Sequence, residues 1–413
     1  MPSRSGPCLA KTGAAPADDV LARVFRDEAA RLTGSVVRLI GDFGVAEEIV
    51  GDTLVIAIER WRRDGIPARP GAWLTTTAKR RAIDRLRRDA TYARKLADID
   101  RDGESVPDEG DDRLRLMFTC CHPALAANAR VALTLQAVLG FTTSDIANSF
   151  VASEAAIAQR LSRARRKITE ARIAYRMPAD DELPERLASV LAVLYLAFNE
   201  GYMSSRPAAP FRRDLAEDAA WLAEELASLM PREAEPLGLL ALMRLNLARS
   251  SARFDAAGRI VLLRDQERSR WDRRAISSAI ALLERAGAMG RPGPYQVQAA
   301  IAACHAEAET WDLTDWVQVV LLYDVLMSMT PTPIVRLNRA IALREIAGPE
   351  AALAEVEALA GEIDGYHLFH ATRAELLRET GDPETARLAE AAALDLTRNE
   401  AERSLLEGRL LSM

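Results

Sequence analysis

The stretch Lys79–Lys95, KRRAIDRLRRDATYARK, is strongly basic within a chain whose formal net charge is -6. It holds eight Lys or Arg and two Asp, a net charge of +6. Most charged helix faces are solvated and mix the two signs, whereas bases prevail here. Arginine suits phosphate because its planar guanidinium donates two hydrogen bonds at once. The stretch therefore predicts a helix that contacts nucleic acid.

The stretch Phe141–Ile168, FTTSDIANSFVASEAAIAQRLSRARRKI, has the spacing of a helix-turn-helix. Thr143 or Ser144 is expected to cap a short helix, and Ser153 a second helix after the turn NSFVAS. An ordinary helical hairpin with a basic end is the alternative, but the caps, the turn length and the charge together favour DNA reading. The positions expected to reach the duplex are Ser153, Glu154, Ala155, Ala156, Gln159, Arg160 and Arg163, followed along the phosphates by Arg165, Arg166 and Lys167.

The sequence TCCHP places Cys120 and Cys121 beside His122, and these residue types are zinc ligands. Adjacent cysteines point in different directions on a helix, and the next Cys–His pair, at His305, is remote in sequence. Buried thiols near a helix end that precedes Pro123 are the preferred interpretation, so no metal or other cofactor is expected. The chain also lacks a Walker loop and a GxGxxG motif after a strand. We therefore expect no catalytic activity of its own.

The composition indicates helices arranged in several domains. A chain of 413 residues with 49% apolar residues is too long for one compact core and too apolar to be largely disordered. Aromatic residues are few, at 5%, which favours helices over strands. No apolar run reaches the roughly 18 residues of a membrane span, the N-terminus has no apolar signal segment, and the four cysteines are scattered. These features predict a cytoplasmic protein.

Periodicity and charge divide the chain into parts of different composition. Helical periodicity without strand-like alternation predicts an all-α fold. Residues 1–175 carry a net charge of +5 and the remainder -11, which suggests separate tasks, with nucleic acid as the partner of the first part. The expected parts are a disordered tail at 1–17, a helical domain at 18–96, a flexible acidic linker at 97–112, a helix-turn-helix domain at 113–176 and a helical extension at 183–413.

The extension contains a repeat near its end. Pro349 recurs as Pro383 and Ala352 as Ala386, both at an offset of 34 residues. This offset is the tetratricopeptide period, in which one helix pair stacks on the next. The repeat predicts a tetratricopeptide-like extension.

Three segments in this order resemble the bacterial sigma factors of the extracytoplasmic-function group, also called group four. They are GVAEEIVGDTLVIAIERW, AWLTTTAKRRAIDRLRR and the helix-turn-helix that ends RLSRARRKI, and the resemblance covers Asp18–Tyr175. LMFTCCHPAL at Leu116–Leu125 and LAFNEGY at Leu196–Tyr202, ahead of the repeat helices, resemble the subgroup with a large C-terminal extension.

The resemblance implies a sigma region-two domain at 18–96, a sigma region-four domain at 113–176 and roles for their residues. Glu47, Glu48 and Asp52, on the exposed side of helix 43–61, would bind core RNA polymerase. The minus-ten element would be held by Trp73, Lys79, Arg80, Arg81, Arg85, Arg87 and Arg88, partly as a single strand. The second helix of the helix-turn-helix would read the minus-thirty-five element. For Asn199, Glu200 and Tyr202 the resemblance suggests a domain contact, although NEGY is most simply interpreted as a helix end, with Gly201 after the last turn.

The predicted function is that of an RNA polymerase sigma factor, which directs core enzyme to specific promoters and assists promoter melting. Its partners would be promoter DNA and core RNA polymerase. The acidic extension is expected to contact either a protein partner or the chain's own sigma half. Two alternatives stay open here: a helix-turn-helix regulator with a helical-repeat sensor domain, and a metal-dependent enzyme that uses Cys120, Cys121 and His122.

Overall fold

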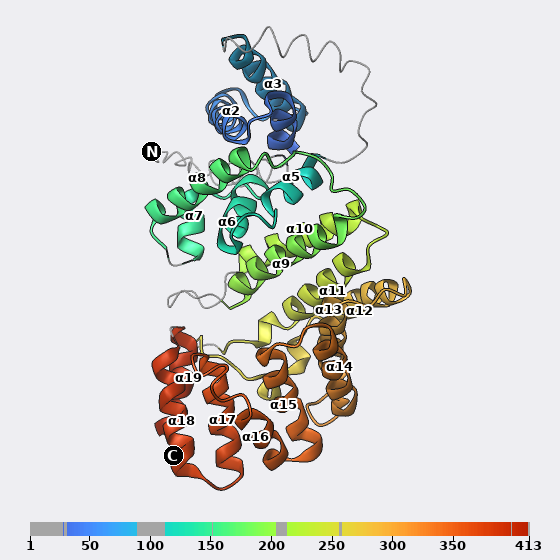
Figure 1. Cartoon of the computed structure of the whole chain (residues 1–413), viewed down its shortest axis with the longest axis vertical. Coiled ribbons are helices and arrows are strands. Elements are labelled where there is room, and N and C mark those ends of the chain that lie inside the picture. The colour runs from blue at the N-terminus through green and yellow to red at the C-terminus, as the bar shows by residue number, and fades with distance from the viewer. Residues whose placement is uncertain are drawn as a thin grey trace, which may run out of the picture. The chain divides into compact units, whose positions relative to one another are not determined.

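A computed structural model of the chain describes residues 28, 31–88, 112–150, 152–203, 213–255, 258–397 and 399–411 (Figure 1). The predicted tail and most of the predicted acidic linker lie outside the described residues. All regular elements in the described part are helices, apart from an isolated antiparallel bridge between Phe254 and Ile260. The all-α prediction is therefore confirmed for this part of the chain.

Helices α2 (Phe43–Asp64) and α3 (Pro70–Arg88) form the described centre of the first predicted domain, after a helical segment at 31–40 (Figure 1). The Asp42 carboxylate accepts a hydrogen bond from the Val45 amide at 2.9 Å and thereby caps α2. The same helix ends at Gly65, whose φ of 85° is a left-handed conformation that glycine adopts without strain. Helix α3 begins at Pro70, where proline at the first position costs no hydrogen bond.

The region around the helix-turn-helix consists of α5 (Asp112–Cys120), α6 (Ala127–Ala137), α7 (Thr143–Ser149) and α8 (Glu154–Glu170). The prediction that Thr143 or Ser144 caps α7 is wrong. Instead, the Thr142 hydroxyl accepts from the Asp145 amide at 3.1 Å, while the Asp145 carboxylate accepts from the Thr142 amide at 3.0 Å. This reciprocal capping box satisfies two amides at once.

Helix α9 (Leu183–Tyr202) begins at residue 183, where sequence placed the start of the extension. The described residues form two compact units, one within 1–147 and 153–190 and the other within 148–152 and 191–413. The first eight residues of α9 thus belong to the unit of the helix-turn-helix.

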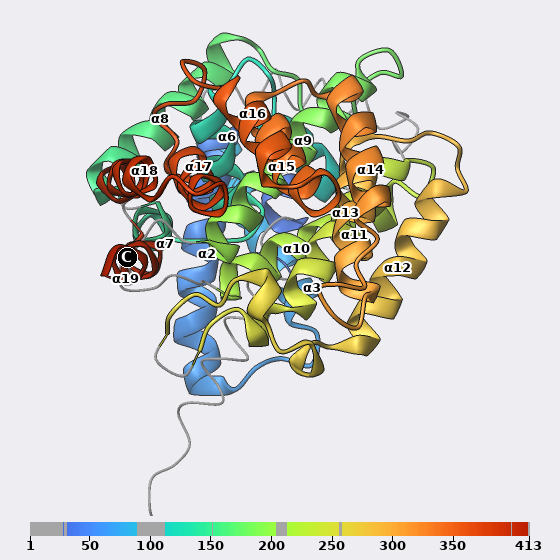
Figure 2. The ribbon, with the colours of Figure 1, turned by 90° about the horizontal axis from the view of Figure 1, so that it is seen from below.

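The rest of the chain forms the helical extension, in which successive helices lie beside one another (Figures 1 and 2). Its helices are α10 (Arg213–Leu229), α11 (Ala234–Ala248), α12 (Arg273–Gly287), α13 (Pro294–Glu307), α14 (Trp316–Met329), α15 (Pro333–Ala347), α16 (Pro349–Glu357), α17 (His367–Glu379), α18 (Pro383–Leu396) and α19 (Glu400–Leu411). Three short 3-10 helices, η2 (Ser250–Ala252), η3 (Leu263–Asp265) and η4 (Arg268–Arg270), lie in the connection between α11 and α12.

The 34-residue repeat coincides with two helix pairs, α15–α16 and α17–α18, which Figure 2 shows in succession. Pro349 and Pro383 begin the second helix of each pair. Ala352 and Ala386 are both fully buried. Their small side chains let the paired helices approach closely. Gly201 lies inside α9 and not after its last turn. A Cβ at this position would come within 2.4 Å of the Ala216 amide on α10, so glycine permits the close approach of the two helices.

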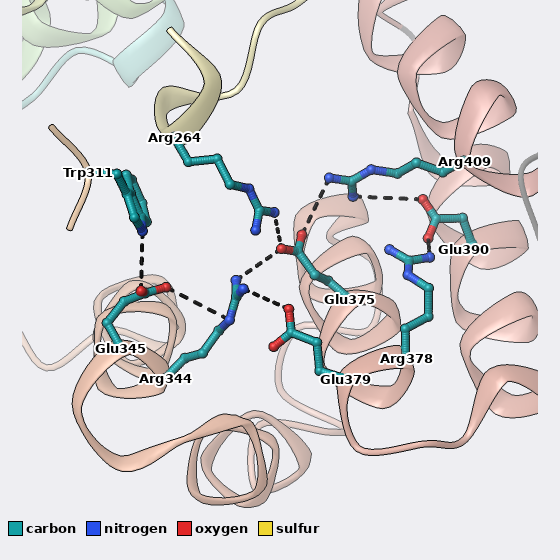
Figure 3. Close-up of polar contacts among 9 residues, drawn as sticks. All are labelled: Arg264, Trp311, Arg344, Glu345, Glu375, Arg378, Glu379, Glu390 and Arg409. Atoms are coloured by element: carbon teal, nitrogen blue, oxygen red, sulfur yellow. Dashed lines mark hydrogen bonds and ion pairs between the residues drawn. The ribbon is translucent and has the colours of Figure 1, made fainter.

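The ion pairs of Glu375 link four elements of the extension (Figure 3). Glu375 on α17 pairs with Arg264 of η3, with Arg344 of α15 at 3.0 Å and with Arg409 of α19 at 3.4 Å. Burial raises the pKa of Glu375, but the three guanidinium charges outweigh it and the pKa is lowered. Every arginine in this network has a carboxylate partner.

Candidate nucleic-acid interface

The cations of α3 lie opposite the face that packs on the core. Leu74, Ala78, Ala82 and Leu86 are buried at every fourth position, as a helical stripe requires. Six of the predicted minus-ten residues are cations of this helix. Five of them, Lys79, Arg80, Arg85, Arg87 and Arg88, are exposed, and Arg81 is half-buried. Ile83 lies beside the buried stripe, but its side chain is 38% exposed and lies at the edge of the cationic face.

Two contacts fix the orientation of α3 on α2. Trp73 makes an edge-to-face contact with Trp61 of α2 at a centroid distance of 5.4 Å, so its ring is half-buried. Arg81 pairs with Asp52 of α2. The second contact occupies one of the carboxylates that the resemblance assigned to polymerase binding, although Asp52 itself is exposed.

Helix α8 places five of its predicted DNA-binding residues along one groove. The Ser153 hydroxyl accepts from the Ala156 amide at 3.2 Å, so the predicted cap of α8 is confirmed. Ile157 and Leu161 are buried, as expected. A groove of about 470 Å³ is lined by the predicted residues Ala156, Gln159, Arg160, Arg163 and Lys167 together with residues 124–126, 129 and 164. The geometry thus brings three cations and one amide of α8 to a single surface.

Arg165 does not lie with these residues. Its guanidinium pairs with Glu47 of α2 and donates to the Gln136 side chain at 2.5 Å. The Glu47 side chain is only 13% exposed, so the prediction that Glu47 lies on the exposed side of α2 is wrong. Burial raises the pKa of Glu47 even though Arg165 opposes the shift. Of the three predicted polymerase-binding carboxylates, Glu48 and Asp52 are exposed.

Substitutions of the two partners of this ion pair are expected to change the free energy of unfolding by different amounts. Arg165→Ala should lower the free energy of unfolding by about 1–3 kcal/mol, because Glu47 would stay buried without its cation. Glu47→Gln should be at least as stable as the wild type at neutral pH. Folding raises the pKa of Glu47, so the ionised carboxylate costs stability above the folded pKa, and the amide removes this cost.

Chemical denaturation of the full-length variants measures both effects, with Glu48→Gln as an exposed control on the same helix. Equal destabilisation by Arg165→Ala and Glu47→Gln would contradict the inference that the buried Glu47 carboxylate needs Arg165 as its counter-charge.

The residues of TCCHP are engaged in structural contacts. Both Cys120 and Cys121 are buried, and burial raises the pKa of Cys121 to about 11, so its thiol stays protonated. The Cys121 sulfur lies 3.3 Å from the Thr134 hydroxyl. The His122 ring accepts a hydrogen bond at Nδ1 from the Ala124 amide at 3.1 Å. Within the described ranges, no three His, Cys, Asp or Glu side chains are grouped to hold a metal ion.

The start of α9 makes contacts that sequence analysis missed. Arg186 donates to the Phe118 carbonyl at 2.7 Å, and the Ser189 hydroxyl donates to the Cys121 carbonyl at 2.5 Å. Arg130 of α6 donates to the Ser189 hydroxyl. These bonds satisfy the carbonyls at the C-terminal end of α5. The first turns of α9 therefore complete the helix-turn-helix unit.

The sequence comparisons agree with this arrangement. Residues 24–91 match the family described as Sigma-70 region 2, and residues 115–168 match Sigma-70, region 4. Residues 186–287 match a family of unknown function, DUF6596. No helix among the described residues is both long and apolar enough to span a membrane. The two basic helices thus lie in the two regions that define an RNA polymerase sigma factor of the sigma-70 type.

Proteins of similar sequence indicate to which group of sigma factors the chain belongs. The ECF RNA polymerase sigma factor SigL of Mycobacterium tuberculosis is 35% identical over 36% of this chain and 88% of its own length. The ECF RNA polymerase sigma factor SigK of Mycobacterium ulcerans is 29% identical over 35% of this chain and 80% of its own length. An uncharacterized protein of Rhizobium meliloti is 39% identical over 91% of this chain and 92% of its length. The chain belongs to the ECF RNA polymerase sigma factors, in a form with a large C-terminal helical extension.

Proposed function

We propose that α3 holds the minus-ten element and that α8 reads the minus-thirty-five element of the promoters this sigma factor serves. The observation that carries the proposal is the groove on α8, which Gln159, Arg160, Arg163 and Lys167 line along the helix that Ser153 caps. On α3, the exposed cations face away from the buried stripe and are available to phosphates. Two DNA-binding helices in one chain bind with high effective concentration when promoter spacing fits.

Polymerase binding is assigned to α2, through its exposed carboxylates Glu48 and Asp52. Glu47 can bind polymerase only when its ion pair with Arg165 is broken. The same ion pair also occupies Arg165, which is proposed to bind a DNA phosphate. The chain itself supplies no catalytic group in this proposal, since the polymerase carries out the chemistry. The site of action is the cytoplasm, where promoter DNA and polymerase are found.

The direct test is transcription with purified components. Core RNA polymerase plus this protein should start transcripts at a defined subset of promoters, and sequencing of the transcript ends should yield a shared two-part motif. Core enzyme alone should not select these starts. A helix-turn-helix regulator would instead require a different sigma factor for any start, so failure with core enzyme alone as partner would contradict the proposal.

Substitutions in α8 separate reading from holding. Gln159→Ala and Arg160→Ala are each expected to change the preference among minus-thirty-five variants by roughly 1–3 kcal/mol where a bidentate base contact is lost. Lys167→Ala should weaken binding to all variants about equally, because a phosphate contact carries no sequence information. Holoenzyme binding to a promoter library measures these effects. Identical profiles for all three variants would show that α8 is not placed in the major groove.

A further inference from the structure

The junction of α11, α13 and the connection between α11 and α12 contains buried hydrogen-bond donors that have no acceptor among the described residues. They are Nε of Arg249, Nη2 of Arg268 and Nε1 of Trp271. The ring atom Nδ1 of His305 is also buried and without a partner in the same part of the extension. Unpaired buried donors are rare in folded proteins, so a cluster of them indicates a missing acceptor.

Trp271 brings these donors together. The guanidinium carbon of Arg268 lies 4.7 Å from the centre of the Trp271 ring, and that of Arg249 lies 5.8 Å from it. Both residues are held by hydrogen bonds to oxygen atoms. Arg249 donates to the Asn246 side chain at 2.6 Å and is hydrogen-bonded to the Tyr202 side chain. Arg268 donates through Nη1 to the His305 and Ala308 carbonyls at 2.6 and 2.7 Å. Only 7% of Arg268 is exposed.

The cluster carries positive charge that no described carboxylate balances at ion-pair distance. Arg253, next along the chain, adds a third cation, whose guanidinium stacks over the Tyr202 ring at 4.0 Å. The pKa of His305 is lowered to about 4 by burial and by the charges of Arg249 and Arg268, so this ring is neutral at physiological pH. The network around Glu375 is different, because there each arginine meets a glutamate (Figure 3).

Ordered water would satisfy these donors only in part. A water molecule accepts two hydrogen bonds but must place its own two hydrogens on acceptors, and it leaves the charge of Arg249 and Arg268 uncompensated. An oxyanion accepts from several donors at once, donates none and neutralises the guanidinium groups. We propose that the α11–α13 junction of the extension binds a small oxyanion, a carboxylate or a phosphate, between Arg249 and Arg268, with Trp271 Nε1 as a further donor.

This site goes beyond promoter recognition, because none of its residues belongs to the two sigma regions. The shared chemistry of its ligand is a compact group with two or more acceptor oxygens and a negative charge. A small metabolite with such a group fits better than a macromolecule, since Arg268 and Trp271 are almost completely buried. The extension would then be a ligand-binding domain appended to a sigma factor.

The test is titration of the full-length protein with sodium phosphate and, separately, with sodium acetate, at constant ionic strength with chloride as the reference anion. Calorimetry should show saturable binding, and the melting temperature should rise with the bound anion. Arg249→Gln should weaken the Kd about tenfold or more, because one charge-assisted hydrogen bond and one charge are lost. In chloride alone, Arg249→Gln should melt no lower than the wild type, because it relieves repulsion from Arg253 and Arg268.

The matched control is Arg274→Gln, which removes the same charge from an exposed position on α12. It should leave binding unchanged. Trp271→Phe keeps an aromatic ring but removes the donor, so it should weaken binding severalfold. This variant provides the test if Arg249→Gln does not fold. Binding of phosphate alone assigns a phosphoryl ligand, and binding of acetate alone assigns a carboxylate ligand. Absence of saturable binding by both anions, or equal affinity in Arg249→Gln and Arg274→Gln, would overturn the proposal.

Discussion

Replacing Arg85 and Arg88 together by Ala is expected to weaken promoter binding by the holoenzyme roughly 30-fold at physiological salt and to flatten its salt dependence. If α3 and α8 together neutralise on the order of six phosphates, log affinity falls with log salt at a slope near -5. Loss of two phosphate contacts should reduce the magnitude of this slope by about 2. Both residues are exposed in the last turns of α3, beyond the contacts that fix this helix on α2.

The fold should tolerate this double substitution. The buried stripe of α3 ends at Leu86, and among the described residues Arg88 bonds within its own helix, to the Asp84 carbonyl at 3.2 Å. Alanine is a good helix former, so helicity is retained. Promoter binding would be measured from 50 to 300 mM salt, with circular dichroism as the check on folding.

The control is Arg274→Ala combined with Arg285→Ala, which removes two exposed charges from α12 in the extension. It should leave both the affinity and the slope unchanged. If the two double variants share the wild-type slope, α3 does not contact the promoter phosphates. If both flatten it equally, net charge alone governs binding, and α3 has no special position.

Local regularity is what made the helices predictable. The stripe Ala78, Ala82 and Leu86 could be read from its spacing, because residues four apart lie above one another on a helix. The same spacing explains why Ile83 is 38% exposed: it follows Ala82 by about 100° around the helix and reaches only the edge of the stripe. The cap of α7 was predictable in principle, since Thr142 and Asp145 have capping-box spacing, but the adjacent Thr143 and Ser144 are equally good cap types.

Contacts between distant parts of the chain could not be predicted. Glu47 and Arg165 are 118 residues apart, and no periodicity relates them. Each alone is typical of an exposed helix position, so sequence assigned one to polymerase and the other to phosphate. The donor cluster of Arg249, Arg268 and Trp271, with His305 beside it, is assembled in the same way, from segments whose approach depends on the packing of the whole extension.

The start of α9 shows the same limit at a domain boundary. MPADDELP has the composition of a linker, and a sequence-based cut after Pro178 would have seemed safe. However, Arg186 and Ser189 bond to the end of α5, so a chain that ends at Pro178 loses part of the helix-turn-helix unit. The cut that preserves the unit lies after Val190.

Removal of the extension is expected to change transcription several-fold, provided that the cut preserves this unit. We propose that the extension modulates the sigma regions or their polymerase, because its net charge of -9 and its stacked helix pairs suit a basic protein surface. Two truncations separate this role from simple loss of folding. Residues 1–190 keep Arg186 and Ser189, whereas residues 1–178 lack both.

The chain of residues 1–178 should melt below the chain of residues 1–190, because loss of two buried hydrogen bonds to the α5 carbonyls costs about 1–3 kcal/mol. Arg186→Ala in full-length protein reproduces half of this loss and serves as the control. Transcription by residues 1–190 would then be compared with full length at several concentrations of core polymerase. Because both proteins retain the same sigma regions, a several-fold difference in either direction reports the extension alone. Equal activity at every core concentration would contradict a role toward the sigma regions or the polymerase and would leave an external partner as the target of the acidic repeats.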